Sequence, residues 1–164
     1  MSRILGIDPG TRVVGYGLLE SRGSRFHALD AGVIRAPAGA PMEVRLAKIA
    51  GELARLIEQH QPDHAAIEDA FVKHDPRAAL TLGEARGAVL AALGAAGLAV
   101  ASYPPATIKK AVTGHGRASK DQVARMVGSV LHLTSLPEPR DATDALAVAL
   151  THALRLKTQH LGRK

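Results

Sequence analysis

Four acidic residues of this chain have types and positions suited to binding divalent cations. Asp141 and Asp144 lie three residues apart beside an apolar run that predicts a helix, so both carboxylates point to the same side of it. Asp8 and Glu68 each close a short apolar run typical of a strand. Hard carboxylate oxygens are the ligands that Mg²⁺ and Mn²⁺ prefer. We therefore predict a site for two such ions, which could activate a water molecule and stabilise a leaving oxygen.

Asp8 and the aspartates of the last predicted helix also have structural explanations. An aspartate before Pro9 and Gly10 is ordinary turn chemistry. One aspartate in a first helical turn is favoured by the free N–H groups there. Two aspartates on one helix face are harder to explain in this way, because they repel each other unless a cation lies between them.

Glu68 follows a strand so apolar that an unpaired carboxylate there would be costly. A structural ion pair with Arg77, Arg86 or a lysine is the alternative to a metal. Because adjacent strand residues face opposite sides of a sheet, only one of Glu68 and Asp69 can join Asp8.

Cysteine and histidine chemistry finds little support in the sequence. The chain has no cysteine, which excludes disulfides, thiolate zinc sites and cysteine nucleophiles. His60 and His64 have the spacing of a zinc pair on a helix, but Pro62 between them argues against a shared helix.

The chain is strongly basic. It has 21 Lys and Arg against 15 Asp and Glu, a net charge of +6 and a pI near 10.1. That excess suits a polyanionic partner such as nucleic acid, although solubility alone would also explain it. Basic residues concentrate in one segment, at Lys109, Lys110, Arg117, Lys120 and Arg125. A solvated helix face is the alternative explanation for Lys110 and Arg125.

The remaining pattern predicts a mixed α/β sheet with helices on both faces. Apolar and β-branched runs predict an antiparallel trio of strands, followed by strands that crossover helices join in parallel. The predicted strands are residues 3–8, 13–19, 26–34, 64–68 and 98–103, and the main helices are residues 46–57, 76–93, 107–112, 119–131 and 141–156. Asp75 is a predicted N-cap, and Ser119 with Gln122 forms a predicted capping box.

One domain is expected over residues 1–157, followed by a basic, disordered tail over residues 158–164. The sequence begins without a charged-then-apolar signal, and no apolar stretch approaches membrane-spanning length. A soluble cytoplasmic protein is the expectation.

Four segments together resemble the RuvC family of bacterial Holliday-junction resolvases. They are residues 4–17 (ILGIDPGTRVVGYG), 66–71 (AIEDAF), 82–87 (LGEARG) and 141–149 (DATDALAVA). The resemblance covers nearly the whole chain, from residue 3 to about residue 153. It implies a ribonuclease H-like fold and a homodimeric endonuclease that nicks four-way DNA junctions symmetrically, in two strands of like polarity. The small-residue helix over residues 76–93 is the candidate dimer interface.

The resemblance also implies roles for individual residues. Asp8, Glu68, Asp141 and Asp144 match the family's four metal-binding positions, of which the third varies between Asp and His. Phe71 matches an aromatic residue that stacks on an unpaired base at the junction centre. Lys109 and Lys120 match basic residues near the scissile phosphate, with Lys120 a catalytic candidate. Further DNA contacts are expected from the basic side chains Arg77, Lys110 and Arg117. A junction-binding protein and a branch-migration motor are the implied partners, with the bacterial nucleoid as the place of action.

Three rival interpretations remain. Residues 6–11 (GIDPGT) also resemble the first phosphate loop of actin-like and sugar-kinase ATPases, which need a second, duplicated domain to enclose the nucleotide. A different nuclease on the same fold, such as one that cuts RNA–DNA hybrids, is the second. An inactive junction binder is the third, and the presence of all four carboxylates argues against it.

Overall fold

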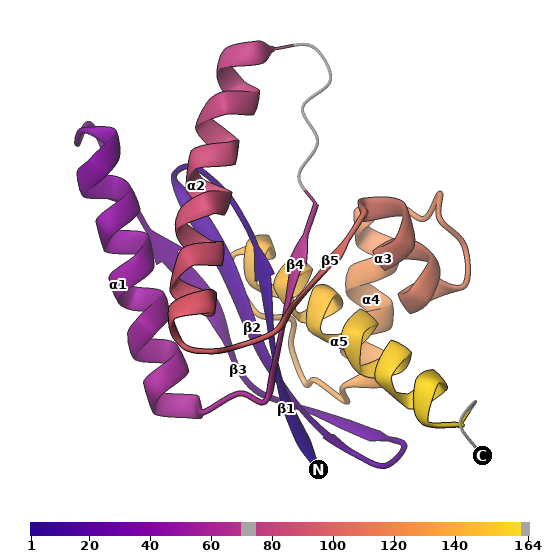
Figure 1. The fold of residues 1–164 in the computed structure, drawn as a ribbon. Helices are drawn as coiled ribbons and strands as arrows, with labels where there is room; N and C mark the ends of the chain where they lie inside the picture. The colour runs from indigo at the N-terminus through magenta and orange to yellow at the C-terminus, as the bar shows by residue number, and fades with distance from the viewer. Residues whose placement is uncertain (70–74, 162–164) are drawn as a thin grey trace.

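The computed structural model describes residues 1–69 and 75–161. Within these ranges the chain forms a five-stranded sheet with helices on both faces, as predicted (Figure 1). The elements follow the predicted order: β1 (Ser2–Asp8), β2 (Val13–Arg22), β3 (Arg25–Arg35), α1 (Met42–His60), β4 (His64–Glu68), α2 (Pro76–Ala95), β5 (Val100–Tyr103), α3 (Pro105–Thr113), α4 (Lys120–Val130) and α5 (Arg140–Leu161).

The central position of β1 organises the sheet. The strand order is β3-β2-β1-β4-β5, in which β1 pairs antiparallel with β2 and parallel with β4. The β2–β3 pair is antiparallel and the β4–β5 pair is parallel. Side chains of β1 alternate between two apolar layers, so that Ile4 packs toward α5 while Leu5 and Ile7 pack toward α1 and α2. Asp8 continues this alternation and faces the α5 side.

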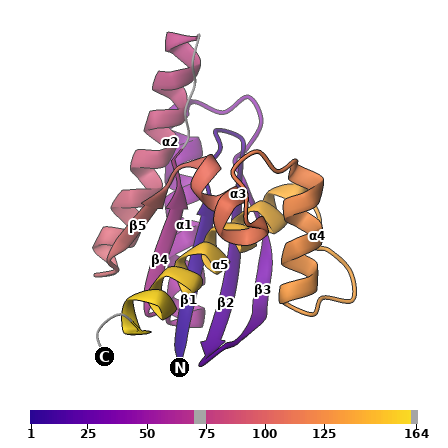
Figure 2. The same ribbon diagram turned by 90° about the vertical axis from the view of Figure 1, so that its right-hand side faces the viewer.

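Helix α5 lies directly on β1 and β2, and Figure 2 shows it running across that face of the sheet. Glycines permit the approach. Gly6 and Gly17 face each other in the β1–β2 ladder. A Cβ on Gly6 would lie 2.5 Å from the backbone nitrogen of Ala149, and one on Gly17 would lie 2.7 Å from that of Leu146. Because any larger residue would displace the helix, these glycines determine how close α5 can come.

Two predicted helix starts are confirmed by their hydrogen bonds. Asp75 Oδ1 accepts from the backbone N–H groups of Arg77 and Ala78, at 2.9 and 3.2 Å. At α4, Ser119 Oγ accepts from Gln122 N at 3.2 Å, and Gln122 Oε1 accepts from Ser119 N at 2.8 Å. Both caps satisfy N–H groups that the helix itself leaves free.

The end of α5 differs from the prediction. The helix continues to Leu161, so the boundary expected at residue 157 lies inside it, and residues 158–161 are helical rather than disordered. Thr158 Oγ1 donates to the carbonyl of Leu154 at 3.0 Å within this last part of the helix. Leu154 packs against the apolar layer on this side of the sheet, so this part of the helix remains in contact with the core.

Helix α2 also departs from the sequence expectation. It is 20 residues long and apolar enough, by length and composition alone, to cross a membrane, so the expectation that no stretch approaches that length is wrong. Its buried side chains begin only at Ala85, followed by Val89 and Leu93. Leu80, in the half before them, is 67% exposed.

A half-buried histidine, His152, lies between α5 and the sheet and makes stability depend on pH. The hydroxyl of Tyr103 is 2.7 Å from Nδ1 of His152, and the His64 ring stands edge-on to it at 5.5 Å. Arg155 lies over the Tyr103 ring. Burial, reinforced by His64, lowers the pKa of His152 from 6.5 to about 4.

We expect the contribution of His152 to the free energy of unfolding to fall as the pH drops from about 6.5 to about 4, while the raised pKa of Asp8 acts in the opposite direction. In that window the unfolded chain binds a proton at residue 152 that the folded chain does not. Because the side chain is only half-buried, the loss should be about 1–2 kcal/mol, less than the full shift implies. Urea unfolding of wild type and His152→Phe at pH 7 and pH 4.5 measures it. An equal pH dependence in the two proteins would contradict the assignment.

Candidate active site

The ends of two neighbouring strands bring the first two carboxylates together. Asp8 is the last residue of β1 and Glu68 the last of β4. These strands are parallel, and Ile7 pairs with Ile67 immediately before the two acids. Both carboxylates therefore emerge at the same edge of the sheet, on the face that α5 covers.

Helix α5 supplies the other two carboxylates from its first turns. Asp8 pairs across the ladder with Gly15, and Gly15 lies directly beneath Asp141. A Cβ on Gly15 would stand 3.2 Å from the Cβ of Asp141 and 2.6 Å from its carbonyl carbon. Asp144 lies one turn further along the helix, with only 15% of its side chain exposed. The absence of a side chain at Gly15 thus lets the start of α5 reach the strand ends.

The four carboxylates act on one another electrostatically. Burial, then the nearby charges of Glu68, Asp144 and Asp141, raise the pKa of Asp8 from 3.8 to about 7. The pKa of Glu68 is also raised, first by burial and then by Asp144. Mutual repulsion of this kind identifies the carboxylates as one group and creates a strong preference for a positive charge among them.

Lys120, the first residue of α4, brings a positive charge to this group. Its Nζ donates to Oδ2 of Asp144 at 2.9 Å, and this hydrogen bond raises the pKa of the lysine. Lys109 of α3 lowers the pKa of Glu68 and lies with Lys120, Glu68 and Asp144 around a small hollow of about 50 Å³. Two lysines therefore face the carboxylates from separate helices.

The structure removes Arg86 from the candidate ion-pair partners of Glu68. Arg86 of α2 donates to Asp69 Oδ1 at 2.9 Å, on the opposite face of the sheet. Glu68 instead faces the hollow beside Lys109 and Lys120, with Asp144 opposite. Only one of the two adjacent acids joins Asp8, as strand geometry predicted, and Arg86 is the partner of the other.

The other predicted DNA contacts lie outside the carboxylate group. Lys110 on α3, Arg117 between α3 and α4, and Arg77 in the first turn of α2 are all exposed. Phe71 lies outside the described residues, so its predicted stacking role stays a prediction.

The donor atoms and the charge of the four acids show whether they fit a divalent cation. Among the residues that the structure describes, no three carboxylate or imidazole groups converge closely enough to form a ready coordination sphere. The four acids nevertheless present only hard oxygen ligands, in a place where burial and the repulsion between carboxylates raise the pKa of Asp8. A divalent cation would remove that repulsion, so the residues fit such an ion in donor type and in charge.

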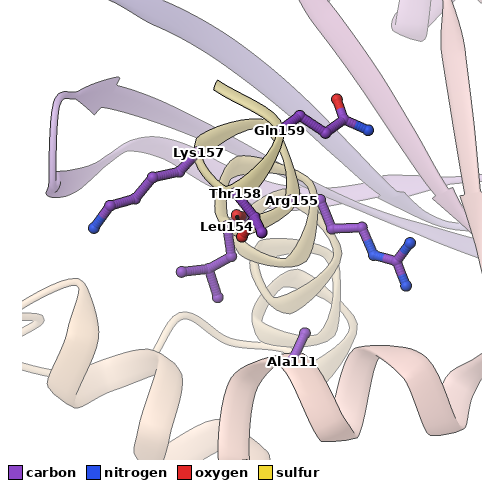
Figure 3. Close-up of a pocket in the computed structure, with 6 residues that line it drawn as sticks. All are labelled: Ala111, Leu154, Arg155, Lys157, Thr158 and Gln159. Atoms are coloured by element: carbon purple, nitrogen blue, oxygen red, sulfur yellow. Dashed lines mark hydrogen bonds between the residues drawn. The ribbon is translucent and has the colours of Figure 1, made fainter. Parts of the chain in front are cut away.

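A larger hollow elsewhere does not have this chemistry. It measures about 580 Å³ and lies beside the C-terminal part of α5, against Ala111 of α3 (Figure 3). Leu154 lines it, ten residues past Asp144, or roughly 15 Å along the helix axis. The hollow has no acidic lining residue, and Figure 3 shows Arg155 and Lys157 pointing to opposite sides of the helix. The carboxylate group is therefore the better candidate for catalysis.

Comparison with known proteins identifies the family. The family model described as crossover junction endodeoxyribonuclease RuvC matches residues 4–152. The chain belongs to the RuvC family. A RuvC of Pelotomaculum thermopropionicum is 46% identical over 150 residues, which are 92% of each chain, and one of Moorella thermoacetica is 49% identical over 92% of this chain and 90% of its own. T. thermophilus RuvC in complex with Holliday junction substrate superposes with a TM-score of 0.92 at 34% identity, over 97% of both chains.

Membership of the RuvC family confirms the ribonuclease H-like fold and the nuclease class, and favours both over the ATPase interpretation. Membership of this nuclease family implies that the protein depends on a divalent metal. Two features of the site were missed in the sequence. The contact of Gly15 with Asp141 was not predicted, and Arg86 was proposed as a partner of Glu68 rather than of Asp69. Neither has a local signal, because each depends on a contact between distant elements.

Proposed function

We propose that this protein is a single-domain endonuclease that resolves four-way DNA junctions during recombination and repair, by paired nicks in two strands of like polarity. The observation that supports it most is the carboxylate group, in which burial, and then the charges of Glu68, Asp144 and Asp141, raise the pKa of Asp8 to about 7. In a chain of the RuvC family, such a group at the end of the central strands is suited to cations and a phosphodiester.

Asp8, Glu68, Asp141 and Asp144 would hold two Mg²⁺ ions, for which Mn²⁺ could substitute. Such ions would supply Lewis acidity toward a phosphate oxygen and a more acidic water. Lys120 serves as a catalytic cation, because its Nζ is already held at the carboxylates by Asp144. From there it can stabilise negative charge that develops on the phosphate in the transition state.

Basic side chains around the group would position the DNA. Lys109 lies beside Glu68 and is the next candidate for a contact near the scissile phosphate. The exposed side chains of Lys110, Arg117 and Arg77 would bind phosphates further away. Contacts of this kind orient a nucleic acid without reading its sequence.

Phe71 would stack on an unpaired base at the junction centre, which is worth about 1–3 kcal/mol per base. We therefore expect Phe71→Ala to slow cleavage of a fully paired junction by about tenfold or more. On a junction whose central bases are already unpaired, the defect should be much smaller. Single-turnover rates on the two substrates measure the difference. An equal defect on both would count against stacking.

A homodimer would place one active site at each of the two strands to be cut, because a junction has two-fold symmetry. Helix α2 is the proposed interface. Its exposed Leu80, and Gly83 and Gly87 with no neighbour within 4 Å of an added Cβ, leave an apolar surface of small residues. Such a surface would pack closely against its symmetry mate.

The proposed activity also implies a cellular location and partner proteins. A junction resolvase would act on bacterial DNA in the cytoplasm, at the nucleoid. It would cooperate there with a junction-binding protein and a branch-migration motor, which present and move the crossover.

The decisive experiment compares an end-labelled four-way junction with a linear duplex of the same sequence, in Mg²⁺ and in EDTA. We expect paired nicks in the junction alone, and only with the metal. Binding without cutting in either Mg²⁺ or Mn²⁺ would reduce the carboxylates to structural groups and leave a junction-binding protein.

A further inference from the structure

Arg86 joins the ends of two strands from the far side of the sheet. Its Nη2 donates to Oδ1 of Asp69 and to Oγ of Ser102, each at 2.9 Å. Asp69 directly follows β4, and Ser102 is the next-to-last residue of β5. One guanidinium on α2 therefore holds together two neighbouring strands where they leave the sheet.

The reverse side of this strand end carries Glu68. Ile67 belongs to the apolar layer under α1 and α2, and it pairs with Ser102. Glu68 comes next and faces Lys109, Lys120 and Asp144 on the other side. Since side chains alternate along a strand, Arg86 holds the backbone on the opposite face from the carboxylate of Glu68.

Strand β4 has only five residues and lies between β1 and β5. Within residues 1–69 and 75–161, the hydrogen bond from Asp69 N to Tyr103 O at 2.9 Å is the last one that joins this strand end to β5. On α2, buried side chains begin at Ala85, next to Arg86, so the guanidinium acts where the helix first meets the sheet.

The ion pair contributes little to overall stability. The side chain of Asp69 is 41% exposed and that of Arg86 29% exposed, and ion pairs this accessible to water add little to stability. The two hydrogen bonds that Arg86 donates, to Asp69 and to Ser102, are instead suited to fixing the position of the backbone at the ends of β4 and β5. An effect on catalysis much larger than the effect on stability is therefore the signature to look for.

We propose that Arg86 is a positioning residue for Glu68, acting through Asp69 and Ser102 at the ends of β4 and β5. The inference rests on the proposed role of Glu68 as a ligand for the catalytic metal. It assigns to α2 a second task beyond the proposed dimer contact, namely holding one carboxylate in place for the cation.

The test compares Arg86→Met, Arg86→Lys and Asp69→Asn with wild type. Arg86→Met should lower the single-turnover cleavage rate about 10–100-fold, the usual range for partners of metal ligands. It should also raise the Mg²⁺ concentration for half-maximal cleavage several-fold, with junction Kd within twofold of wild type. Arg86→Lys, which can keep one contact, should recover part of the rate. The double variant of Arg86→Met and Asp69→Asn should be no slower than the slower single variant.

Amide hydrogen exchange measures the order of the strand end directly and does not depend on activity. In Arg86→Met the amide hydrogen of Asp69 should exchange with solvent at least tenfold faster, because its bond to Tyr103 O loses support. The matched control is Arg55→Met on α1, which removes an ion pair of 3.0 Å to Glu52 far from the site. That variant should match wild type in rate, metal dependence and exchange of this amide.

Three outcomes would overturn the inference. These are unchanged metal dependence in Arg86→Met, a loss of junction binding in parallel with the rate, and independent, multiplicative effects in the double variant. Parallel loss of binding would instead mark Arg86 as a DNA contact. Failure of the wild-type protein to cut junctions would refute the proposed function, whereas faster exchange at Asp69 would still support the anchoring contact.

Discussion

Asp8→Asn is expected to abolish junction cleavage, with a loss of at least about 10³-fold, while junction binding survives. The substitution keeps the size of the side chain and removes the charge that sits among Glu68, Asp144 and Asp141. Asparagine cannot replace a carboxylate as a strongly charged ligand for Mg²⁺, so the transition state loses electrostatic stabilisation. Binding depends mainly on basic side chains around the group and should change by less than about threefold.

The same variant should fold at least as stably as wild type. Asp8 contributes a carboxylate whose pKa is raised to about 7, which means that its charged form is unfavourable in the folded chain without a cation. Cleavage gels, junction titrations and urea unfolding at pH 8 measure the three quantities. Asp30→Asn, which changes an acid on β3 that interacts with Tyr16 and His60, is the matched control and should cut normally. Equal loss of binding and cleavage in Asp8→Asn would contradict the metal role.

Gly15→Ala is expected to have the second largest effect, through the position of α5. The new Cβ would lie 2.6 Å from the carbonyl carbon of Asp141, so the first turn of the helix must move away from β2. Overpacking of this kind lowers the free energy of unfolding by about 1–3 kcal/mol. The displacement moves Asp141 relative to Asp8, and we expect cleavage to fall about 100-fold or more.

The control for this change is another glycine-to-alanine substitution. Gly51 lies exposed in α1 with no atom within 4 Å of an added Cβ. Gly51→Ala should therefore raise stability by about 0.5–1 kcal/mol, because alanine favours a helix, and leave cleavage unchanged. Thermal unfolding and single-turnover cleavage of both variants test the idea. Normal cleavage by Gly15→Ala would show that the close approach of α5 to β2 does not determine the site.

The sequence alone determined the elements and the chemistry of this chain. Apolar periodicity distinguished strands from helices, and turn and cap residues such as Asp75 and Ser119 marked where helices begin. These signals are local, since each depends on residues within a few positions of one another. The four carboxylates could be selected for the same reason, because an acid at the end of an apolar run stands out without knowledge of its neighbours.

Only the tertiary structure decided how those carboxylates meet. The place of β1 between β2 and β4 sets Asp8 beside Glu68, and the missing side chain at Gly15 lets Asp141 approach both. Lys120 pairs with Asp144, and Arg86 pairs with Asp69 rather than Glu68. Such pairings join residues tens of positions apart, and their free energy comes from packing and charge across elements. No pattern within one segment of the chain can encode that choice, so it appears only when the sheet and helices are assembled.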